Sequence, residues 1–355
     1  MKRIKFLGIF LSVFFWGASL LAAAPPPSPA DGIPGATDKT LAATLIVPFF
    51  EVGINVATEP IDTLLVVTNV KASQRKFHYH VWDINGNAMD LYGDQDLNGS
   101  ATWSKSMRAL IAGSTSAVKT ALTDGNFYRG FVTIDVVTAE TTKNPTESGY
   151  PFASGSSNNC LEGFTYYVRL SEGSSNSMDM IPVNWVGNSV DGKLVGFYGA
   201  SSLDELETLT ADARNCAAVL ASDVGPCPLV EEISQVDSRV FLLPAFNATT
   251  RIILFAWDTD FLGGPSTYCD THTCDSAYTY KRFDEEGSTV VDNTIRLDKV
   301  VNVINVTGTT NGWVSIRNIP DPTTNRHVYA FSITNAKPSS GAANWDAILE
   351  SFIIP

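Results

Sequence analysis

The sequence predicts a mainly β protein, built from two tandem antiparallel β-sandwich-like modules that a short helical connector joins. Short runs of β-branched and aromatic residues recur along the chain, and such runs favour strands. Asp-x-x-Gly elements between them supply the residues that tight reversals between strands need. The order of these blocks in the first half of the chain returns in the second half, which indicates an internal duplication.

Each copy begins with an apolar run that contains a proline, followed by a threonine-led strand, an Asp-x-x-Gly reversal and a Gly-aromatic-Val-Thr/Ser-Ile strand. The blocks are residues 45–50, 63–68, 79–87 and 130–134 in the first copy, and residues 241–246, 250–255, 280–288 and 312–316 in the second. This order aligns Pro48 with Pro244, Gly86 with Gly287, and Phe131 with Trp313. Because proline cannot donate a ladder hydrogen bond, we expect both proline-containing strands to lie at a sheet edge or to end there.

The chain divides into five parts. Residues 1–24 have the basic, apolar and small-residue regions of a secretory signal peptide, with a single uncleaved anchor as the alternative, and residues 25–42 form a Pro-rich spacer. The first module is expected over residues 43–200, the helical connector over 201–238 and the second module over 239–355. A capping box at residues 202–205 and the apolar residues that follow on one face indicate the connector helix.

Two kinds of segment interrupt the strand pattern of the first module. Residues 106–123 hold Ala, Leu and Val at spacings that predict a short helix. Residues 92–100 and 141–159 are rich in polar residues and glycine, and they predict surface loops.

Composition limits the kind of partner. The 355 residues include 37 acidic and 24 basic side chains, for a net charge of -13. A field of this sign repels phosphate backbones, so nucleic acid is not expected as a partner. Calcium or a cationic partner would suit it better. The leader predicts export to the periplasm, the cell surface or the medium.

Export also decides how the five cysteines are interpreted, since oxidising compartments allow disulfides. The short spacing of Cys269 and Cys274 favours a disulfide between them. Cys216 and Cys227 flank a predicted reversal and are a second pair, which leaves Cys160 over. A Cys/Cys/His metal site that uses His272 is the alternative, although a structural zinc site normally needs a fourth ligand.

One segment has oxygen ligands at the alternate positions that calcium loops use. The candidate ligands are Asp94, Asp96, Asn98 and Ser100, with Gly99 at the sharp turn. In an EF-hand a glutamate would close the loop where this chain has Lys105. An ordinary polar turn is the alternative, and no cofactor other than calcium is predicted.

Other candidates for chemistry have simpler structural interpretations. His78 and His80 stand two apart on a predicted strand, a spacing that metals use, but the outer face of a strand is the expected place for them. Acidic neighbours could form a glycosidase pair, although solvated turns are favoured; they are Asp258 with Asp260, Glu231 with Glu232, and residues 284–286. The tryptophans beyond the leader could stack on sugars, but core packing is favoured; they are Trp82, Trp103, Trp185, Trp257, Trp313 and Trp345.

The runs at residues 47–52 (Val-Pro-Phe-Phe-Glu-Val) and 164–169 (Phe-Thr-Tyr-Tyr-Val-Arg) resemble segments of uncharacterised exported bacterial β-rich proteins. The resemblance implies export and β structure, and it assigns a role to no residue. We find no motif of a catalytic nucleophile or phosphate-binding loop. We therefore expect an exported, non-catalytic structural, assembly or adhesion protein that associates with itself or with a cell-surface partner. A carbohydrate-binding protein with a glycan partner is the alternative, and a glycoside-acting enzyme is third.

Overall fold

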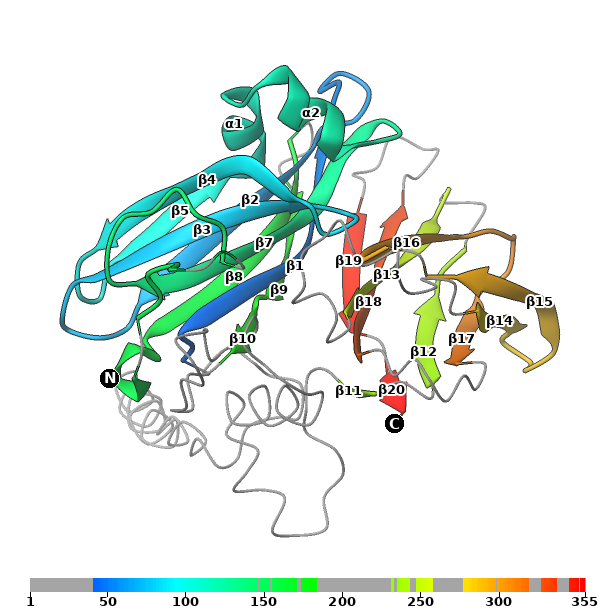
Figure 1. The fold of residues 1–355 in the computed structure, drawn as a ribbon. Helices are drawn as coiled ribbons and strands as arrows, with labels where there is room; N and C mark the ends of the chain where they lie inside the picture. Colours follow the sequence, from blue (N-terminus) through cyan, green and yellow to red (C-terminus); the bar gives the residue numbers. More distant parts are fainter. Residues whose placement is uncertain are drawn as a thin grey trace, which may run out of the picture.

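The structure, a computed structural model, describes residues 41–183 and 231–354, except residues 146, 148, 154, 171–173, 233–234, 243–246, 258–276, 298, 319–326, 337–344 and 351. Within these ranges the chain is mainly antiparallel β structure, as the sequence predicts (Figure 1). The predicted connector lies largely outside them, so its helix stays a prediction. The two α-helices in the described part are too short to cross a membrane.

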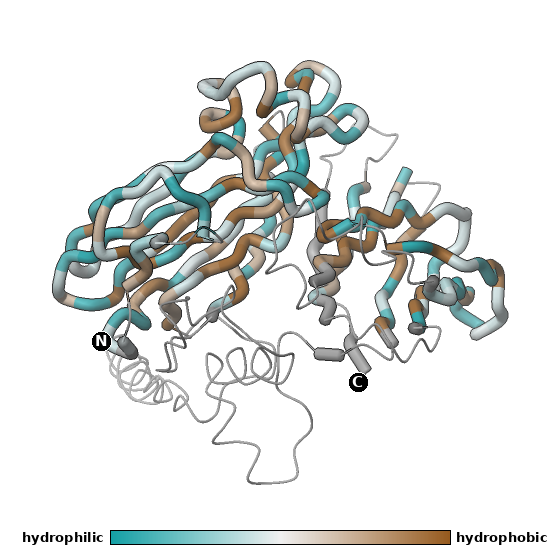
Figure 2. Tube along the Cα trace, in the orientation of Figure 1, coloured by the Kyte–Doolittle hydropathy of each residue, from teal (hydrophilic) through white to brown (hydrophobic). Residues whose placement is uncertain are grey.

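The first module is a sandwich of two antiparallel sheets. One sheet contains β1 (Thr44–Gly53), β3 (Arg75–Asp83), β4 (Ala88–Leu97), β6 (Thr123–Asp124), β7 (Phe127–Val137) and β10 (Ile181–Val183). The other contains β2 (Ile61–Asn69), β5 (Thr102–Ser106), β8 (Leu161–Arg169) and β9 (Ser174–Asp179). Residues from both sheets, such as Leu45, Leu65 and Val132, meet in one buried cluster between them. Figure 2 shows that hydrophobic residues alternate with hydrophilic residues along the strands.

The predicted helix over residues 106–123 is present as two short helices, α1 (Met107–Ala112) and α2 (Ser116–Leu122). The side chains of Ser106 and Thr115 accept hydrogen bonds from backbone N–H groups of the first turns, so each helix has a polar N-cap. A single turn of 3₁₀-helix, Ser156–Asn158, lies in the predicted loop at residues 141–159.

The second module repeats this architecture. One sheet contains β12 (Gln235–Val240), β14 (Ala277–Asp284), β15 (Thr289–Arg296), β17 (Gly312–Asn318) and β20 (Phe352–Ile354). The other contains β11 (Glu231–Glu232), β13 (Thr249–Trp257), β16 (Val301–Val306), β18 (His327–Ala336) and β19 (Trp345–Glu350). The strand order β10-β1-β7-β3-β4 of the first module corresponds to β20-β12-β17-β14-β15 here, and β5-β2-β8-β9 corresponds to β16-β13-β18-β19. Duplication predicts this correspondence.

The two Asp-x-x-Gly reversals have the same backbone hydrogen bonds. In the first module the N–H of Asp83 donates to the carbonyl of Asn87 at 3.0 Å, and the N–H of Gly86 donates to the carbonyl of Asp83 at 3.2 Å. In the second, Asp284 with Ser288 and Gly287 with Asp284 make the same bonds at 3.0 and 3.1 Å. Gly86 and Gly287 have φ of 90° and 85°, a conformation that glycine adopts without strain. The predicted match of these glycines is confirmed.

The Gly-aromatic strands also correspond. Phe131 lies opposite Trp82 on β3, and Trp313 lies opposite Phe283 on β14. A Cβ atom on Gly130 would lie 2.0 Å from the carbonyl oxygen of Trp82, and one on Gly312 would lie 1.9 Å from that of Phe283. Close approach of a neighbouring backbone therefore requires glycine at the same place in both modules.

The predicted match of Pro48 with Pro244 is wrong, because Pro48 lies within β1 whereas Pro244 lies beyond the end of β12, the equivalent strand. Leu45 and Val236 occupy equivalent places, because they pair with Ile134 and Ile316 on β7 and β17. Strand β12 ends at Val240, and Pro244 lies outside the described residues. The apolar run at residues 241–246 suggested a strand by composition, whereas the alternately buried Val236, Ser238 and Val240 make up the observed one.

The structure also corrects the expected end of the helical connector and bears on the expected place of Pro48. Strand β12 starts at Gln235, inside the range 201–238 that the sequence assigns to the helical connector, because residues 235–240 alternate as a strand with one buried face. Strand β1 pairs with both β7 and β10, but the β10 ladder covers only Thr44–Ile46, so Pro48 has β7 alone beside it among the described strands. Pro48 also lies at a β-bulge between Val47 and Phe50, where no ladder bond is required of it.

We expect Gly130→Ala to lower the free energy of unfolding by about 1–3 kcal/mol, the usual effect of forcing extra volume into a packed site. Gly113→Ala is the matched control, because Gly113 has φ of -78° and a Cβ there would meet no atom closer than 3.7 Å. Urea denaturation of both variants measures the difference. Equal stabilities would contradict the close approach of the Trp82 carbonyl.

Candidate functional site

The two modules meet through a buried apolar cluster. It includes Phe49 and Phe131 from the first module and Phe255 and Phe331 from the second. The rings of Phe131 and Phe255 lie 5.3 Å apart edge to face, and those of Phe49 and Phe331 lie 6.4 Å apart. In β13, Ile252 and Leu254 belong to the core of the second module, whereas Ile253 and Phe255 belong to this junction cluster. Burial on both faces explains the continuous apolar run of β13.

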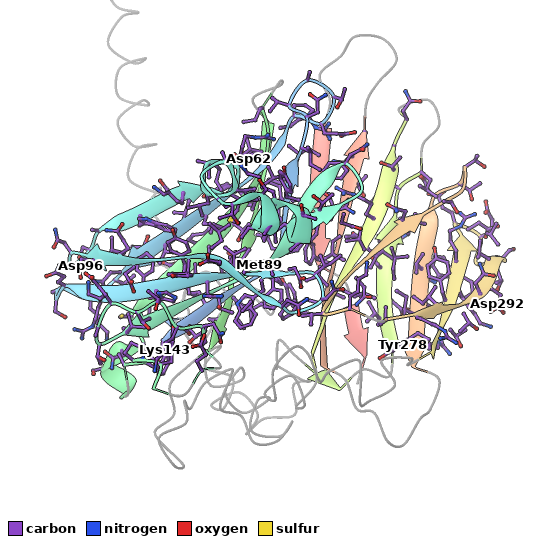
Figure 3. The ribbon with its side chains drawn as sticks, turned by 45° about the horizontal axis from the view of Figure 1, so that its top comes forward. Asp62, Met89, Asp96, Lys143, Tyr278 and Asp292 are labelled. Atoms are coloured by element: carbon purple, nitrogen blue, oxygen red, sulfur yellow. The ribbon has the colours of Figure 1, made fainter. Side chains whose placement is uncertain are left out.

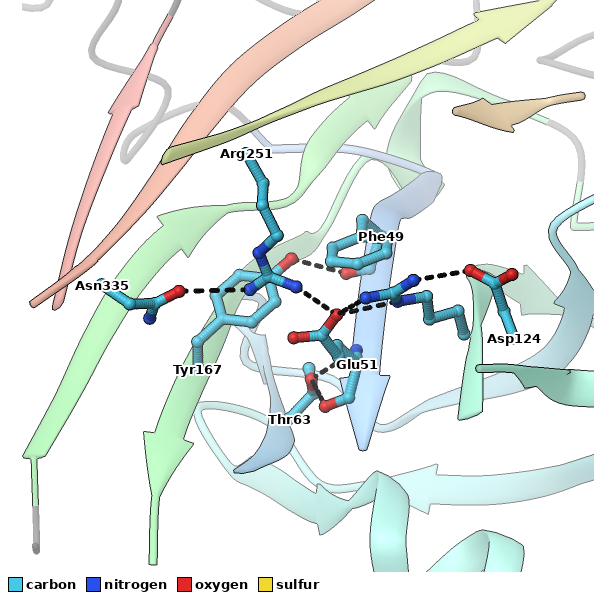
Figure 4. A network of polar contacts seen from close by, with 8 residues as sticks. Phe49, Glu51, Thr63, Asp124, Tyr167, Arg251 and Asn335 are labelled. Carbon is cyan, nitrogen blue, oxygen red and sulfur yellow. Dashed lines mark hydrogen bonds and ion pairs between the residues drawn. The ribbon is translucent and has the colours of Figure 1, made fainter. Parts of the chain in front are cut away.

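A charged network lies at one end of this junction (Figure 4). Glu51 on β1 is directly opposite Arg129 on β7, whose Nε and Nη2 atoms lie 2.8 and 2.6 Å from Glu51 Oε2. Arg251 on β13 of the second module places Nη1 2.5 Å from the same oxygen. Asp124 accepts a further bond from Arg129 Nη1 at 2.6 Å. One carboxylate oxygen thus joins arginines from both modules.

The carboxylate of Glu51 is held ionised. Only 1% of its side chain is exposed, and burial alone would raise its pKa. The charges of Arg251 and Arg129 and their hydrogen bonds outweigh burial, so the pKa of Glu51 lies below its ordinary value. Removal of this carboxylate is expensive, because Arg251 would lose the partner of its charge and Arg129 would keep only Asp124.

Neutral hydrogen bonds fix the backbone around Glu51. The hydroxyl of Thr63 accepts from the Glu51 N–H at 3.0 Å and donates to the Glu51 carbonyl at 2.9 Å. Thr250 makes the same pair of bonds with the backbone of Phe241 in the second module, each at 3.0 Å. The aligned threonines of the two copies therefore share one structural role.

A cleft with a volume of about 390 Å³ opens above the network, at the junction of the two modules. Volumes of this size are usual for small-molecule sites. Most of its lining is polar or charged. The lining residues are Glu59, Ile61, Asp124, Gly125, Asn126, Phe127, Arg129 and Arg169 from the first module, and Arg251, Asn305 and Asn335 from the second. Asn305 is directly opposite Arg251 in the β13–β16 pair, so both side chains lie on one face of that sheet.

A second polar cluster is buried on one face of the β1-β7-β3-β4 sheet. His78 and His80 are both buried there, so the expectation that they lie on the outer, solvated face of a strand is wrong. The Nδ1 atom of His78 lies 3.1 Å from Asp94 Oδ1, and the ring of His80 stacks on Tyr92 at 5.7 Å. Burial lowers the pKa of His80 to about 3.

Asp135 is a further ionisable member of this cluster. It is fully buried on β7 and accepts hydrogen bonds from Thr44 Oγ1 at 2.5 Å and from the Tyr150 hydroxyl at 2.9 Å. Burial raises the pKa of Asp135 to about 7, although both hydrogen bonds act in the opposite direction. The sequence analysis did not identify Asp135 or Glu51 as candidate site residues. A signal was present for both, because each is an acidic residue with apolar neighbours on both sides in its strand.

Asp135 and His80 contribute to the pH dependence of stability with opposite signs. Folded Asp135 keeps its proton up to about pH 7, whereas in the unfolded chain it ionises near 3.8, so its contribution to stability falls as pH rises between these values. His80 acts oppositely, because its depressed pKa makes stability rise with pH between about 3 and 6.5. Burial also lowers the pKa of His78, so its contribution to stability has the same sign as that of His80.

Asp135→Asn should remove only the first contribution. From pH 4 to pH 8, its stability relative to the wild type should therefore improve by up to about 4 kcal/mol, from 1.36 kcal/mol per pKa unit. Urea denaturation at several pH values measures this difference. Thr133→Val changes the same sheet face without removing a titratable group, and its curve should run parallel to the wild type. A parallel curve for Asp135→Asn would contradict the raised pKa.

The calcium candidates fall on a strand and the turn after it. Asp94 and Asp96 lie on β4, so the loop predicted over residues 92–100 is wrong for residues 92–97. Asp94 lies against His78, and Asp96 pairs with Lys76 at 3.0 Å at the outer end of the first module (Figure 3). Asn98 and Ser100 follow in the turn, with Ser100 at φ of 59°. Among the described residues no group of three or more His, Cys, Asp or Glu side chains is placed to hold a metal, and calcium binding stays a prediction.

The remaining candidates are only partly described. Cys160 is buried and free, while Cys216, Cys227, Cys269 and Cys274 lie outside the described residues, so their pairing stays a prediction. His272, Asp258, Asp260 and Trp185 also lie outside them. Trp82 is fully buried, as core packing predicts, whereas Trp103 and Trp313 are half-buried.

Comparisons with known proteins assign no family. No family description and no curated protein matches the chain. Among solved structures, the apo lectin of Pleurotus ostreatus has 11% identity and a TM-score of 0.18, and the match covers 89% of this chain and 85% of that one. The FMN-binding β-glucuronidase of Facaelibacterium prausnitzii has 10% identity and a TM-score of 0.15 over 87% and 32%. The 11S globulin procruciferin of Brassica napus has 9% identity and a TM-score of 0.16 over 87% and 76%.

Proposed function

We propose that this chain is an exported, non-catalytic binding protein of the structural or adhesion class, and that it holds its ligand in the cleft between its modules. The observation that carries the proposal is the shared oxygen of Glu51, which joins arginines of both modules directly beneath the cleft. Walls fixed in this way need little ordering when a ligand binds, and preorganisation favours affinity. With a glycan as the ligand, the chain would be a carbohydrate-binding protein.

The charges of the network favour binding over catalysis. A general acid must carry a proton near neutral pH, and the lowered pKa of Glu51 keeps it ionised. Arg129 divides its donors between Glu51 and Asp124, so the orientation of its guanidinium is fixed. Such groups hold a ligand in place more readily than they transfer a proton.

Assembly by strand addition is a second candidate, which the β15 edge favours. Strand β15 pairs with β14 alone among the described strands, and most of its residues are exposed, including Val290 at 46%. An exposed edge of this kind can pair with a strand of another molecule. Light scattering across a range of concentrations tests it. Oligomers of the wild type that dissociate in the Val290→Lys variant would support assembly. A monomer at every concentration would exclude self-assembly.

The binding proposal is tested on the purified mature chain with a panel of glycans, peptides and general glycoside-hydrolase substrates. We expect saturable binding without turnover. Turnover of a substrate by the wild type that is lost in Glu59→Gln or Asp124→Asn would contradict the proposal and indicate an enzyme. An absence of binding to every class of ligand would also contradict it.

A further inference from the structure

The cleft combines hydrogen-bond donors and acceptors with a balanced charge. Three guanidinium groups, of Arg129, Arg169 and Arg251, face the carboxylates of Glu59 and Asp124 in the lining and of Glu51 beneath it. The local sum is close to zero in a chain with a net charge of -13. An anionic ligand would find no surplus of positive charge here, and a cationic ligand would find no surplus of carboxylates.

Some of the polar groups in the lining have hydrogen-bonding capacity to spare. Asn126 in the first module and Asn305 in the second are both exposed, and their side chains make no hydrogen bond within the described part of the chain. The carboxylate of Glu59 likewise has no hydrogen-bond or ion-pair partner among the described residues. Each amide offers two donors and an acceptor, and the carboxylate offers acceptors. These groups come from both walls of the cleft.

One aromatic ring, that of Phe127, lies among these polar groups. Phe127 lies in the lining, and the guanidinium carbon of Arg129 stands 4.7 Å from the centroid of its ring. The cation–π contact fixes the ring and the guanidinium together. The guanidinium covers one face of the ring, which leaves the opposite face or the edge of Phe127 for the C–H face of a pyranose. The hydroxyl groups of the sugar suit the surrounding amides and ions.

From this arrangement we infer that the cleft binds a neutral saccharide, which contacts both modules at once. A hydroxyl is the group that donates and accepts together, so a polyol satisfies a lining that mixes Asn, Arg and carboxylate side chains. The balanced charge favours an uncharged sugar over a uronic acid or a sulfated one. The inference rests on the proposed binding function, and it adds the chemical class of the ligand and the residues that select it.

Isothermal titration calorimetry of the intact mature chain tests this inference. The probes are neutral gluco-, galacto- and manno-oligosaccharides, with uronic acid oligosaccharides and sulfated oligosaccharides of matched length. We expect binding of a neutral probe, and a rise in Kd of roughly 5- to 10-fold in both Asn126→Ala and Asn305→Ala, as loss of a hydrogen bond predicts. Asn293→Ala is the control, because Asn293 is exposed on β15, at the far side of the second module (Figure 1), and should leave Kd unchanged.

Neutral sugars that bind both cleft variants as tightly as the wild type would place the site outside the cleft, which would contradict both the inference and the cleft site of the proposed function. Other results would overturn the inference while leaving the proposed binding function intact. Binding of only the uronic acid or sulfated probes would contradict the charge argument, and binding of peptides but of no saccharide would contradict the ligand class. Turnover of a bound sugar would instead contradict the proposed function itself.

Discussion

Glu51→Ala should lower the free energy of unfolding by roughly 3–5 kcal/mol, the usual cost of removing one partner from a buried ion pair. The side chains of Arg129 and Arg251 are only 11% and 12% exposed, so the variant removes the shared carboxylate from two largely buried side chains. Arg129 keeps its ion pair with Asp124, so the loss of charge compensation at Arg251 is the larger part of this effect. Chemical denaturation of the variant and the wild type measures it.

Asp292→Ala is the matched control for this prediction. Asp292 pairs with Lys281 at 3.0 Å, but the two side chains are 55% and 38% exposed, and Asp292 lies far from the junction (Figure 3). An exposed pair contributes at most about 1 kcal/mol. A double-mutant cycle of Glu51→Ala with Arg251→Ala would isolate the coupling across the junction. A loss at Glu51 no larger than that at Asp292 would show that the network does not join the modules.

Trp82→Ala should have a comparable effect, roughly 3–5 kcal/mol, because the truncation leaves a large cavity in a packed cluster. Trp82 is fully buried, its ring stacks on Phe131 at 5.6 Å, and its Nε1 donates to Thr133 Oγ1 at 2.9 Å. The variant would also leave the Thr133 hydroxyl without this donor. Thermal and urea denaturation both report the loss.

Trp313→Ala is the internal comparison. Trp313 occupies the place of Phe131 in the second module and stacks on Phe283 at 5.1 Å, but it is only half-buried. The equivalent sheet face in the second module is thus less covered than the face that carries Trp82. We expect a smaller loss at Trp313, and an equal or larger loss would contradict the burial of the Trp82 face at the junction.

Much of the fold was predictable because its signals are local. The Asp-x-x-Gly reversals specify hairpins through Gly86 and Gly287, and the Gly-aromatic blocks specify strands β7 and β17. The spacing of Ala, Leu and Val over residues 106–123 also predicted helix before Asp124, although two short helices form there and not one. The register of β12 was not predictable from composition, because residues 241–246 are more apolar than the alternating residues 235–240 that form the strand.

The candidate site depends on contacts that sequence spacing does not reveal. Glu51 meets Arg129 and Arg251 from 78 and 200 positions away. A charged residue within the run Val-Pro-Phe-Phe-Glu-Val signals a buried partner without naming it. The alternation of side chains along a strand correctly predicted that His78 and His80 share one face. The burial of that face depends on the elements that cover it, which the spacing of the two histidines does not reveal.

Differential scanning calorimetry of the purified chain tests most directly whether the two modules form one unit at the Glu51 junction. We expect one cooperative transition, with equal calorimetric and van't Hoff enthalpies, and a lower midpoint for Glu51→Ala. Two independent transitions in the wild type, with neither shifted by Glu51→Ala, would contradict it.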